Sequence, residues 1–286
     1  KMTVLQGFLL GILQGVAEFL PISSSGHLAL AQSLFGLEDV PLLYDIFLHM
    51  ATLLAVTIYF WPKIWALLKC FGRLITKKQK SDNQVQISEN DLLCPTDKIG
   101  QKTIIAIILT TAITGTFGVI TSKLIPDLSI KFVCGGFLVT SALLIISSIM
   151  EKRQSAKGPN EFTGISIKQS IIIGIMQGFG TLPGISRSGS TIAGALFGGV
   201  NRSLAGEFSF IVSIPAILGA FILELKDLGQ MSSSIGAAPI IAGCISSFAV
   251  GYFSLSVLMK IIKKGKLQWF AAYLIPVGIL GLIFLK

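Results

Sequence analysis

The chain has 286 residues, of which 52% are hydrophobic and only 13% are charged, whereas an ordinary soluble domain carries roughly 25% charged residues. This composition excludes a typical soluble protein and indicates a chain that crosses a membrane several times. The formal net charge is +9, but the basic residues gather in a few loops between apolar blocks, which argues against a nucleic-acid partner.

Apolar blocks follow one another along the chain, and blocks of about 17 to 25 residues are long enough to cross a bilayer as helices. They are continuous and do not alternate with polar residues, which favours helices over strands. We therefore predict an all-α polytopic membrane protein with six transmembrane helices and two re-entrant helical hairpins. In chain order these are hairpin 3–35, spans 41–61, 103–122 and 132–150, hairpin 169–200, and spans 205–225, 236–258 and 268–285.

Two segments of the chain resemble each other at a constant offset of 163 residues. Among the identical positions are Gly11, Gln14, Gly15, Ile22, Ser23, Ser25 and Gly26 in the first segment, which match Gly174, Gln177, Gly178, Ile185, Ser186, Ser188 and Gly189 in the second. A match of this density indicates a duplication. The chain thus divides into a first repeat, 1–150, which includes the polar loop 62–102, and a second repeat, 169–286, within one integral membrane domain.

Each repeat begins with an apolar stretch that proline, glycine and serine interrupt near its middle. The two arms of each stretch are too short to cross the bilayer singly, so a hairpin that enters and leaves by one face fits them better. Three full spans follow each hairpin, and an odd number turns the second repeat upside down relative to the first. The repeats are therefore predicted to have inverted topology, with the two hairpin tips meeting near the midplane.

The basic residues indicate the orientation. Sixteen of the 23 Lys and Arg lie in the segments 62–102, 151–168 and 258–268, and only three lie in the other loops, 36–44, 121–131 and 224–236. By the positive-inside rule the basic loops are cytoplasmic, and the stretch 76–101 is interpreted as a solvated cytoplasmic loop. The first hairpin then enters the membrane from the outer side.

Polar and ionisable groups at membrane depth cost about 2.5–3.5 kcal/mol each on insertion scales, so they usually mark function. In this chain they gather at the two hairpin tips, as Gln14, Glu18, Ser23, Ser24, Ser25 and His27 in the first and Ser186, Arg187, Ser188, Ser190 and Thr191 in the second. Because Gln14 and Glu18 are four residues apart, they share one helix face. A carboxylate and an imidazole beside a serine-rich turn can supply a base, a nucleophile and an orienting group.

Each serine-rich turn also presents the N-terminus of the following arm, where free N–H groups and the helix dipole favour anions. Arg187 adds a planar fork suited to phosphate oxygens, so the two tips together predict a pyrophosphate site. Structural alternatives are helix packing for Ser24 and Ser186, and a purely structural ion pair between Arg187 and Glu18. His49, on a full span, is interpreted as a hydrogen-bonded or pore-facing residue.

The first tip reads Gln14-Gly-Val-Ala-Glu18-Phe-Leu-Pro-Ile-Ser-Ser24-Ser-Gly-His27, and the second reads Pro183-Gly-Ile-Ser-Arg-Ser-Gly-Ser-Thr191. A third stretch, Glu207-Phe-Ser-Phe, leads to Ile214-Pro215. These motifs, in this order, resemble those of the undecaprenyl-pyrophosphate phosphatases, also called the bacitracin-resistance proteins, and the resemblance runs nearly end to end. The chain departs from the family pattern at Gln14, a position that the family often fills with glutamate.

The resemblance implies a catalytic core of Glu18, Ser24, His27 and Arg187, and a substrate pocket lined by Gln14, Ser23, Ser25, Ser186, Ser188 and Thr191. It implies hydrolysis of undecaprenyl pyrophosphate to undecaprenyl phosphate and inorganic phosphate, which recycles the cell-wall lipid carrier and confers bacitracin resistance. A divalent cation, Mg²⁺ or Ca²⁺, would assist, with Glu18 as its candidate ligand. The resemblance implies a protein of the bacterial inner membrane whose active site opens to the outer side. Its implied partners are the polyprenyl pyrophosphate lipid and the bilayer, and a homodimer is left open.

Several mechanisms and one other function are compatible with these residues. Ser24 is the hypothesised nucleophile, with His27 or Glu18 accepting its proton, and Arg187 and the helix N-termini stabilise the transferring phosphoryl group. His27 as nucleophile and a metal-bound water are the alternatives. A flippase or transporter of polyprenyl phosphate is the alternative function, because inverted repeats with broken helices are typical of secondary carriers.

Overall fold

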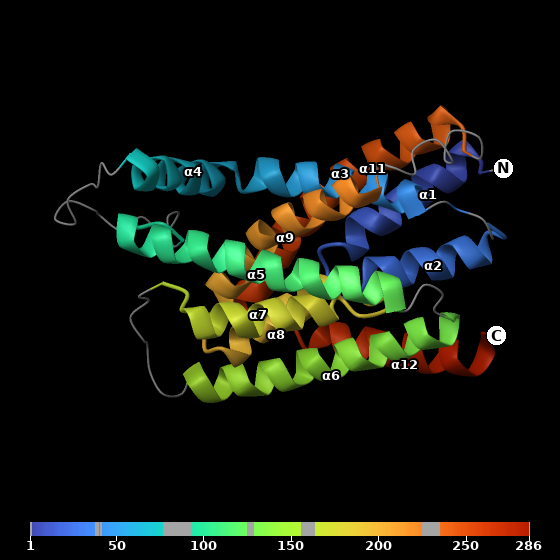
Figure 1. Ribbon diagram of the computed structural model, residues 1–286. Helices are drawn as coiled ribbons and strands as arrows, with labels where there is room; N and C mark the ends of the chain where they lie inside the picture. The colour runs from blue at the N-terminus through green and yellow to red at the C-terminus, as the bar shows by residue number, and fades with distance from the viewer. Residues whose placement is uncertain are drawn as a thin grey trace.

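The structure, a computed structural model, describes residues 2–37, 40, 42–76, 93–124, 129–155, 164–224 and 235–285. Over these residues every regular element is a helix, which confirms the predicted all-α class. The helices are α1 (Val4–Ala17), α2 (Ser24–Leu34), α3 (Leu42–Tyr59), α4 (Trp61–Thr76), α5 (Asp97–Leu124), α6 (Ile130–Ser155), α7 (Ile167–Phe179), α8 (Arg187–Phe197), α9 (Arg202–Glu224), α11 (Ala237–Lys263) and α12 (Trp269–Phe284). They form an elongated bundle, with α1 and the end of α12 near one end and α4 at the other (Figure 1).

Helices long and apolar enough to cross a membrane make up most of the bundle. Among the described residues four helices meet this description, namely α5, α6, α9 and α11. A fifth candidate is α3 together with α4, although the two helices meet at an angle of 77°. The predicted span at 268–285 corresponds to α12, whose 16 residues make it a shorter apolar helix. The described residues thus contain four or five candidate membrane spans, while the count of six stays a prediction.

The two predicted hairpins each contain two short helices. The helices α1, α2, α7 and α8 have 14, 11, 13 and 11 residues, so each is about 16–21 Å long, shorter than the roughly 30 Å hydrocarbon core of a bilayer. Within each hairpin the two arms pack on one another, and each first arm also packs on a long helix of the other half of the chain: α1 on α11, and α7 on α5.

The first arms of the two hairpins begin with the same capping box. In α1 the Thr3 side chain accepts the N–H of Gln6, whose own side chain accepts the N–H of Thr3. In α7 Ser166 and Gln169 make the same two contacts. This arrangement satisfies N–H groups that the first helical turn would otherwise leave unpaired. The two boxes lie 163 residues apart, at the offset of the sequence match.

Glycine lets both first arms approach their neighbours closely. A Cβ on Gly11 would lie only 2.2 Å from the carbonyl oxygen of Gly243 in α11. At the matching position in the other half, a Cβ on Gly174 would lie 3.0 Å from Cβ of Ile113 in α5. Close approach of this kind is how helices associate in membranes, and here the Thr114 hydroxyl also donates to the Gly174 carbonyl over 3.3 Å. Both first arms are therefore held closely, near their middles, against a long helix of the other half of the chain.

Candidate active site

The second arm of each hairpin begins at a serine whose side chain caps the helix. The Ser23 hydroxyl accepts the N–H of Gly26 at the start of α2, and the Ser186 hydroxyl accepts the N–H of Gly189 at the start of α8. The first helical residue after each cap carries a functional group: Ser24 in α2 and Arg187 in α8. Both helices thus present their N-terminal N–H groups and the positive end of their dipole at a tip.

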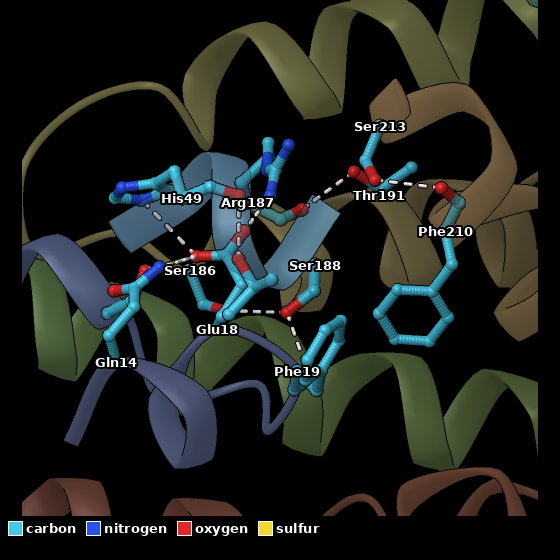
Figure 2. A network of polar contacts seen from close by, with 12 residues as sticks. Gln14, Glu18, Phe19, His49, Ser186, Arg187, Ser188, Thr191, Phe210 and Ser213 are labelled. Carbon is cyan, nitrogen blue, oxygen red and sulfur yellow. Dashed lines mark hydrogen bonds and ion pairs between the residues drawn. The ribbon is translucent and has the colours of Figure 1, made fainter. Parts of the chain in front are cut away.

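The two tips meet through a buried ion pair between the Arg187 guanidinium and the Glu18 carboxylate (Figure 2). Only 4% of the Glu18 side chain and 20% of the Arg187 side chain is exposed. A second contact joins the tips, because the Ser188 hydroxyl donates to the Phe19 carbonyl over 3.3 Å. Side chains 169 residues apart in the sequence are therefore brought together, as the repeat predicts.

The Glu18 carboxylate lies at the centre of a dense set of donors. The Ser24 hydroxyl donates to its Oε2 over 2.7 Å, and the Gln14 amide donates to the same oxygen over 3.0 Å. His49 Nε2 lies 3.2 Å from Oε2, and Arg187 occupies Oε1. A buried carboxylate needs such compensation, because an unpaired charge in this environment is very costly.

Ser24 follows a strained residue that His27 holds in place. Among the described residues Ser23 is the one non-glycine residue with positive φ, at φ 70° and ψ 95°, a conformation that costs on the order of 1–3 kcal/mol. His27 Nδ1 lies 2.8 Å from the Ser23 carbonyl oxygen, and its Nε2 lies 2.9 Å from the Tyr273 hydroxyl. Because a carbonyl only accepts, Nδ1 carries a proton, and Nε2 of the neutral ring accepts from Tyr273.

This geometry bears on the predicted role of His27 as a base or nucleophile. Both of its ring nitrogens are engaged by groups other than Ser24 and Glu18, and its ring packs 4.9 Å from the Phe137 ring between centroids. The imidazole that contacts Glu18 is that of His49 in α3. His49 Nδ1 lies 2.7 Å from the Asp45 carbonyl, so both of its nitrogens face acceptors, which suits an imidazolium.

The second tip supplies hydroxyl groups beside Arg187. The Ser186 and Ser188 hydroxyls lie 3.2 Å apart, and the Ser186 backbone N–H donates to the Thr140 hydroxyl over 3.0 Å. Thr191 donates to the Arg187 carbonyl over 2.6 Å. These three predicted residues are buried, whereas Ser25 is the one predicted site residue that is exposed.

A cavity lies next to the ion pair, between the tips and the helices α3 and α9. Hydroxyl groups that the sequence did not single out line it, namely those of Thr52, Ser209 and Ser213. Val56 and Phe210 are among its apolar wall residues, so the cavity has both polar and apolar lining. Hydroxyl residues commonly serve helix packing in membranes, which is why Thr52 and Ser213 carried no signal in the sequence. Ser209 lies within the Glu207-Phe-Ser-Phe stretch, but its hydroxyl was not predicted to line the site.

The site offers few ligands for a metal ion. No group of three or more His, Cys, Asp or Glu that could hold a metal is present among the described residues. Beside Glu18, however, the Gln14 Oε1 atom is buried without a hydrogen-bond partner. Mg²⁺ is usually bound through one or two carboxylates together with substrate phosphates. The residues therefore fit a divalent cation shared with a substrate and do not fit a site built of protein groups alone.

Comparison with known proteins agrees with the motifs. Residues 7–280 match the family model described as Bacitracin resistance protein BacA. A protein of Treponema denticola named undecaprenyl-diphosphatase is 45% identical over 97% of this chain and 96% of its own length. Proteins of the same name from Methanosphaera stadtmanae and Desulforapulum autotrophicum are 38% and 36% identical, over 98% and 99% of this chain and 97% and 98% of their own lengths. The chain therefore belongs to the bacitracin resistance protein BacA family.

Proposed function

We propose that this protein hydrolyses undecaprenyl pyrophosphate to undecaprenyl phosphate and inorganic phosphate. Its relatives carry the name undecaprenyl-diphosphatase, and the name of its family implies bacitracin resistance. The observation that carries the proposal is the buried meeting of Ser24 and Glu18 with Arg187, at the N-termini of α2 and α8. An acid, a hydroxyl and a guanidinium at two dipole ends can bind and cleave a pyrophosphate.

Ser24 acts as the nucleophile and Glu18 as its base. The hydroxyl already donates to the carboxylate over 2.7 Å, which is the geometry of an activated serine. The Ser24 oxygen bonds to the terminal phosphorus, the bond from this phosphorus to the bridging oxygen breaks, and undecaprenyl phosphate leaves while Glu18 holds the proton. Water then displaces the serine oxygen, which regains a proton, and inorganic phosphate leaves together with one proton released to solvent.

Arg187 and the helix N-termini stabilise the transferring phosphoryl group. The guanidinium pairs with Glu18, and a phosphate that enters the cavity would compete with this carboxylate for it. His49 stays beside Glu18 and compensates its charge during this exchange. Groups that contact the developing charge contribute about 10²–10³ in rate each. Arg187 is the largest such contributor available at the two tips.

A divalent cation, Mg²⁺ or Ca²⁺, completes the proposed site. Glu18 and the unpaired Gln14 Oε1 would hold it together with the pyrophosphate oxygens. When bound, the cation supplies positive charge that shields the pyrophosphate from the incoming serine oxygen. The proposal expects phosphate release to depend on added Mg²⁺ or Ca²⁺ and to stop with a chelator.

The finer architecture is part of the proposal: six spans and two re-entrant hairpins in two inverted repeats. Support comes from the matching capping boxes of α1 and α7, from the matching serine caps of α2 and α8, and from the packing of each first arm on the opposite half of the chain. The basic loops face the cytoplasm, so the site opens to the outer side of the bacterial inner membrane.

Sidedness can be measured by labelling single cysteines in cells. Asp39 and Gln79, both outside the described residues, are replaced by cysteine one at a time in a background whose four cysteines have been changed to serine. A membrane-impermeant maleimide should label Asp39→Cys in intact cells and Gln79→Cys only after lysis. Labelling of both positions from the same side contradicts the proposed topology.

Hydrolysis is distinguished from transport by using purified protein in detergent, where no membrane separates two sides. The wild type should release inorganic phosphate from a C55 pyrophosphate in the presence of Mg²⁺ or Ca²⁺. The variant Glu18→Gln keeps the shape of the side chain, removes its negative charge, and should release almost none. A wild-type protein that binds the lipid and releases no phosphate with either cation would refute the enzyme and favour a carrier of polyprenyl phosphate.

A further inference from the structure

The helix α4 does not continue the membrane span that precedes it. It turns away from α3 at 77° and lies at the end of the bundle opposite α1 (Figure 1). Its 16 residues include three basic ones, Lys63, Lys69 and Arg73. Basic residues are costly inside the hydrocarbon layer, so this helix suits the membrane surface better than the interior.

Two ion pairs fix one face of α4 on the bundle. Arg73 Nη2 lies 2.5 Å from Asp97 Oδ1 and its Nε lies 3.0 Å from the same oxygen, at the first residue of α5. At the other end of α4, Lys63 Nζ lies 2.5 Å from Glu207 Oε2 in α9. Leu67, between these pairs, is buried. The rotation of α4 is thereby set, and its opposite face points away from the protein.

The outward face of α4 is aromatic and apolar with one lysine. Trp61, Trp65 and Leu68 are each about half exposed and Ile75 is 66% exposed, and their spacing puts them on one side of the helix. The two tryptophan rings stack with centroids 6.0 Å apart, and Lys69 Nζ lies 5.5 Å from the centre of the Trp65 ring. Tryptophan and lysine side chains with an apolar body and a polar tip are typical of the membrane–water interface.

A second lysine–tryptophan pair lies at the start of α12. Lys266 Nζ is 5.4 Å from the centre of the Trp269 ring, at the start of α12, and Trp269 is 67% exposed. The preceding Gly265 lies against the Arg202 guanidinium in the first turn of α9, the helix whose Glu207 pairs with α4. Two independent parts of the chain thus place the same kind of interface anchor around the start of α9.

We propose that α4 is an interfacial helix whose Trp61–Trp65–Lys69 face lies in the headgroup region of an anionic membrane leaflet and binds the phosphates of anionic phospholipids. The apolar exposed side chains reach the upper acyl region, and Lys69 reaches the headgroup phosphates. The charge of the chain is complementary to such a surface, because Lys77, Lys78 and Lys80 follow α4 directly in the sequence. This proposal stands apart from the chemistry at the hairpin tips.

The position of α4 can be measured by tryptophan quenching in vesicles of the full chain. The double variant Trp61→Phe/Trp269→Phe leaves Trp65 as the one tryptophan of the three and keeps the aromatic contact at position 61. Lipids brominated near the headgroup end of the acyl chain should quench Trp65 more strongly than lipids brominated near the methyl end. Stronger quenching by the deep bromine, or strong quenching by aqueous iodide without quenching by either lipid, overturns the interfacial placement.

The lipid class is tested in the same background with brominated phosphatidylglycerol and brominated phosphatidylcholine. We expect a preference of about fivefold for the anionic lipid near Trp65, since one basic residue at an anionic surface contributes about that much. Lys69→Glu should abolish the preference, and glycerol phosphate in solution should not compete with the lipid. Equal quenching by the two lipids with Lys69 present overturns the anionic-lipid site.

A matched control separates Lys69 from the total charge of the protein. Lys168→Glu changes the charge by the same amount at an exposed residue of α7 and should leave the preference near Trp65 unchanged. A loss of preference in Lys168→Glu equal to that in Lys69→Glu would mean that overall charge attracts the lipid, which contradicts a site on α4. Elution as a single symmetric species in detergent checks that every variant is folded.

Discussion

The two hairpin tips share a backbone plan and carry opposite chemistry. Ser24 and Arg187 occupy the same place, directly after a serine cap and at the first residue of a short helix. Gln14 of the first tip has Gln177 as its identical counterpart at the offset of 163. Glu18, in contrast, has Thr181 as its counterpart. In the proposed mechanism the first tip would supply the nucleophile and the base, and the second tip would supply the guanidinium.

The two tips also differ in how their turns are made. The first tip forces Ser23, a residue with a side chain, into positive φ, and His27 and Tyr273 hold it there. The second tip uses Gly184, at φ +86°, where a Cβ would lie 2.1 Å from the Val133 carbonyl. Backbone strain at Ser23 therefore lies directly before the proposed nucleophile Ser24. The second tip avoids such strain, because glycine adopts a positive φ readily. Substitutions at matched positions test this division.

The largest effect is expected at Ser24. Ser24→Ala removes the proposed nucleophile and should lower kcat by at least about 10³-fold, as loss of a nucleophilic serine does elsewhere. Ser33→Ala, an exposed serine of the same helix, is the matched control and should keep wild-type turnover. The measurement is phosphate release from a C55 pyrophosphate in detergent.

Trapping of the covalent intermediate gives a second measurement on Ser24. Acid quenching during turnover of substrate labelled in its terminal phosphate should leave label on the wild-type chain and none on Ser24→Ala. Normal turnover by Ser24→Ala contradicts the serine mechanism. A wild-type chain that turns over and never retains label points to direct attack by water.

Arg187 should give the next largest effect. Arg187→Ala removes the guanidinium that contacts the transferring group and should lower kcat by about 10²–10³-fold. The kcat of Arg187→Lys should fall between that of the wild type and that of Arg187→Ala, because a lysine keeps the charge and loses the planar fork. If Arg187 only neutralises Glu18, the alanine variant will melt at a lower temperature while the folded fraction keeps its turnover.

A stability comparison tests the close approach of the second tip's turn to α6. Gly184→Ala and Gly36→Ala both put a side chain at positive φ, but Gly36 has open space around it. The Gly184 variant should therefore lose about 1–3 kcal/mol more of the free energy of unfolding, the usual cost of overpacking. Thermal unfolding in detergent measures this difference, and equal losses would show that the close approach of Gly184 to α6 is unimportant.

The smallest effect is expected at Tyr273. Tyr273→Phe removes the hydrogen bond to His27 Nε2, which is worth about 0.5–1.5 kcal/mol, so kcat should fall about 2–10-fold. If His27 only holds the Ser23 turn, KM and the shape of the pH–rate profile should not change. A shifted pH profile in this variant would instead assign His27 a part in proton transfer.

The sequence predicted the helical class and several apolar helices, which the structure confirms, because long apolar blocks are local signals. The inverted repeat, the re-entrant hairpins and the roles of the residues at their tips stay predictions. The sequence did not predict that His49 would contact Glu18. Helical spacing tells which residues share a face, but the distance between faces depends on how α3 rotates and packs. The available signal was an ionisable residue inside an apolar span. The cation, the oligomeric state and the sidedness stay predictions.

The pairing of Arg187 with Glu18 has a consequence for selectivity. Because the Glu18 carboxylate already binds the guanidinium, an anion must bind Arg187 more strongly than Glu18 does in order to displace it. A pyrophosphate, with more charge and more oxygens, is better equipped to do so than the monophosphate that it yields. We therefore expect weakly charged lipids to bind poorly, and the regenerated monophosphate carrier to be released as Glu18 pairs with Arg187 again.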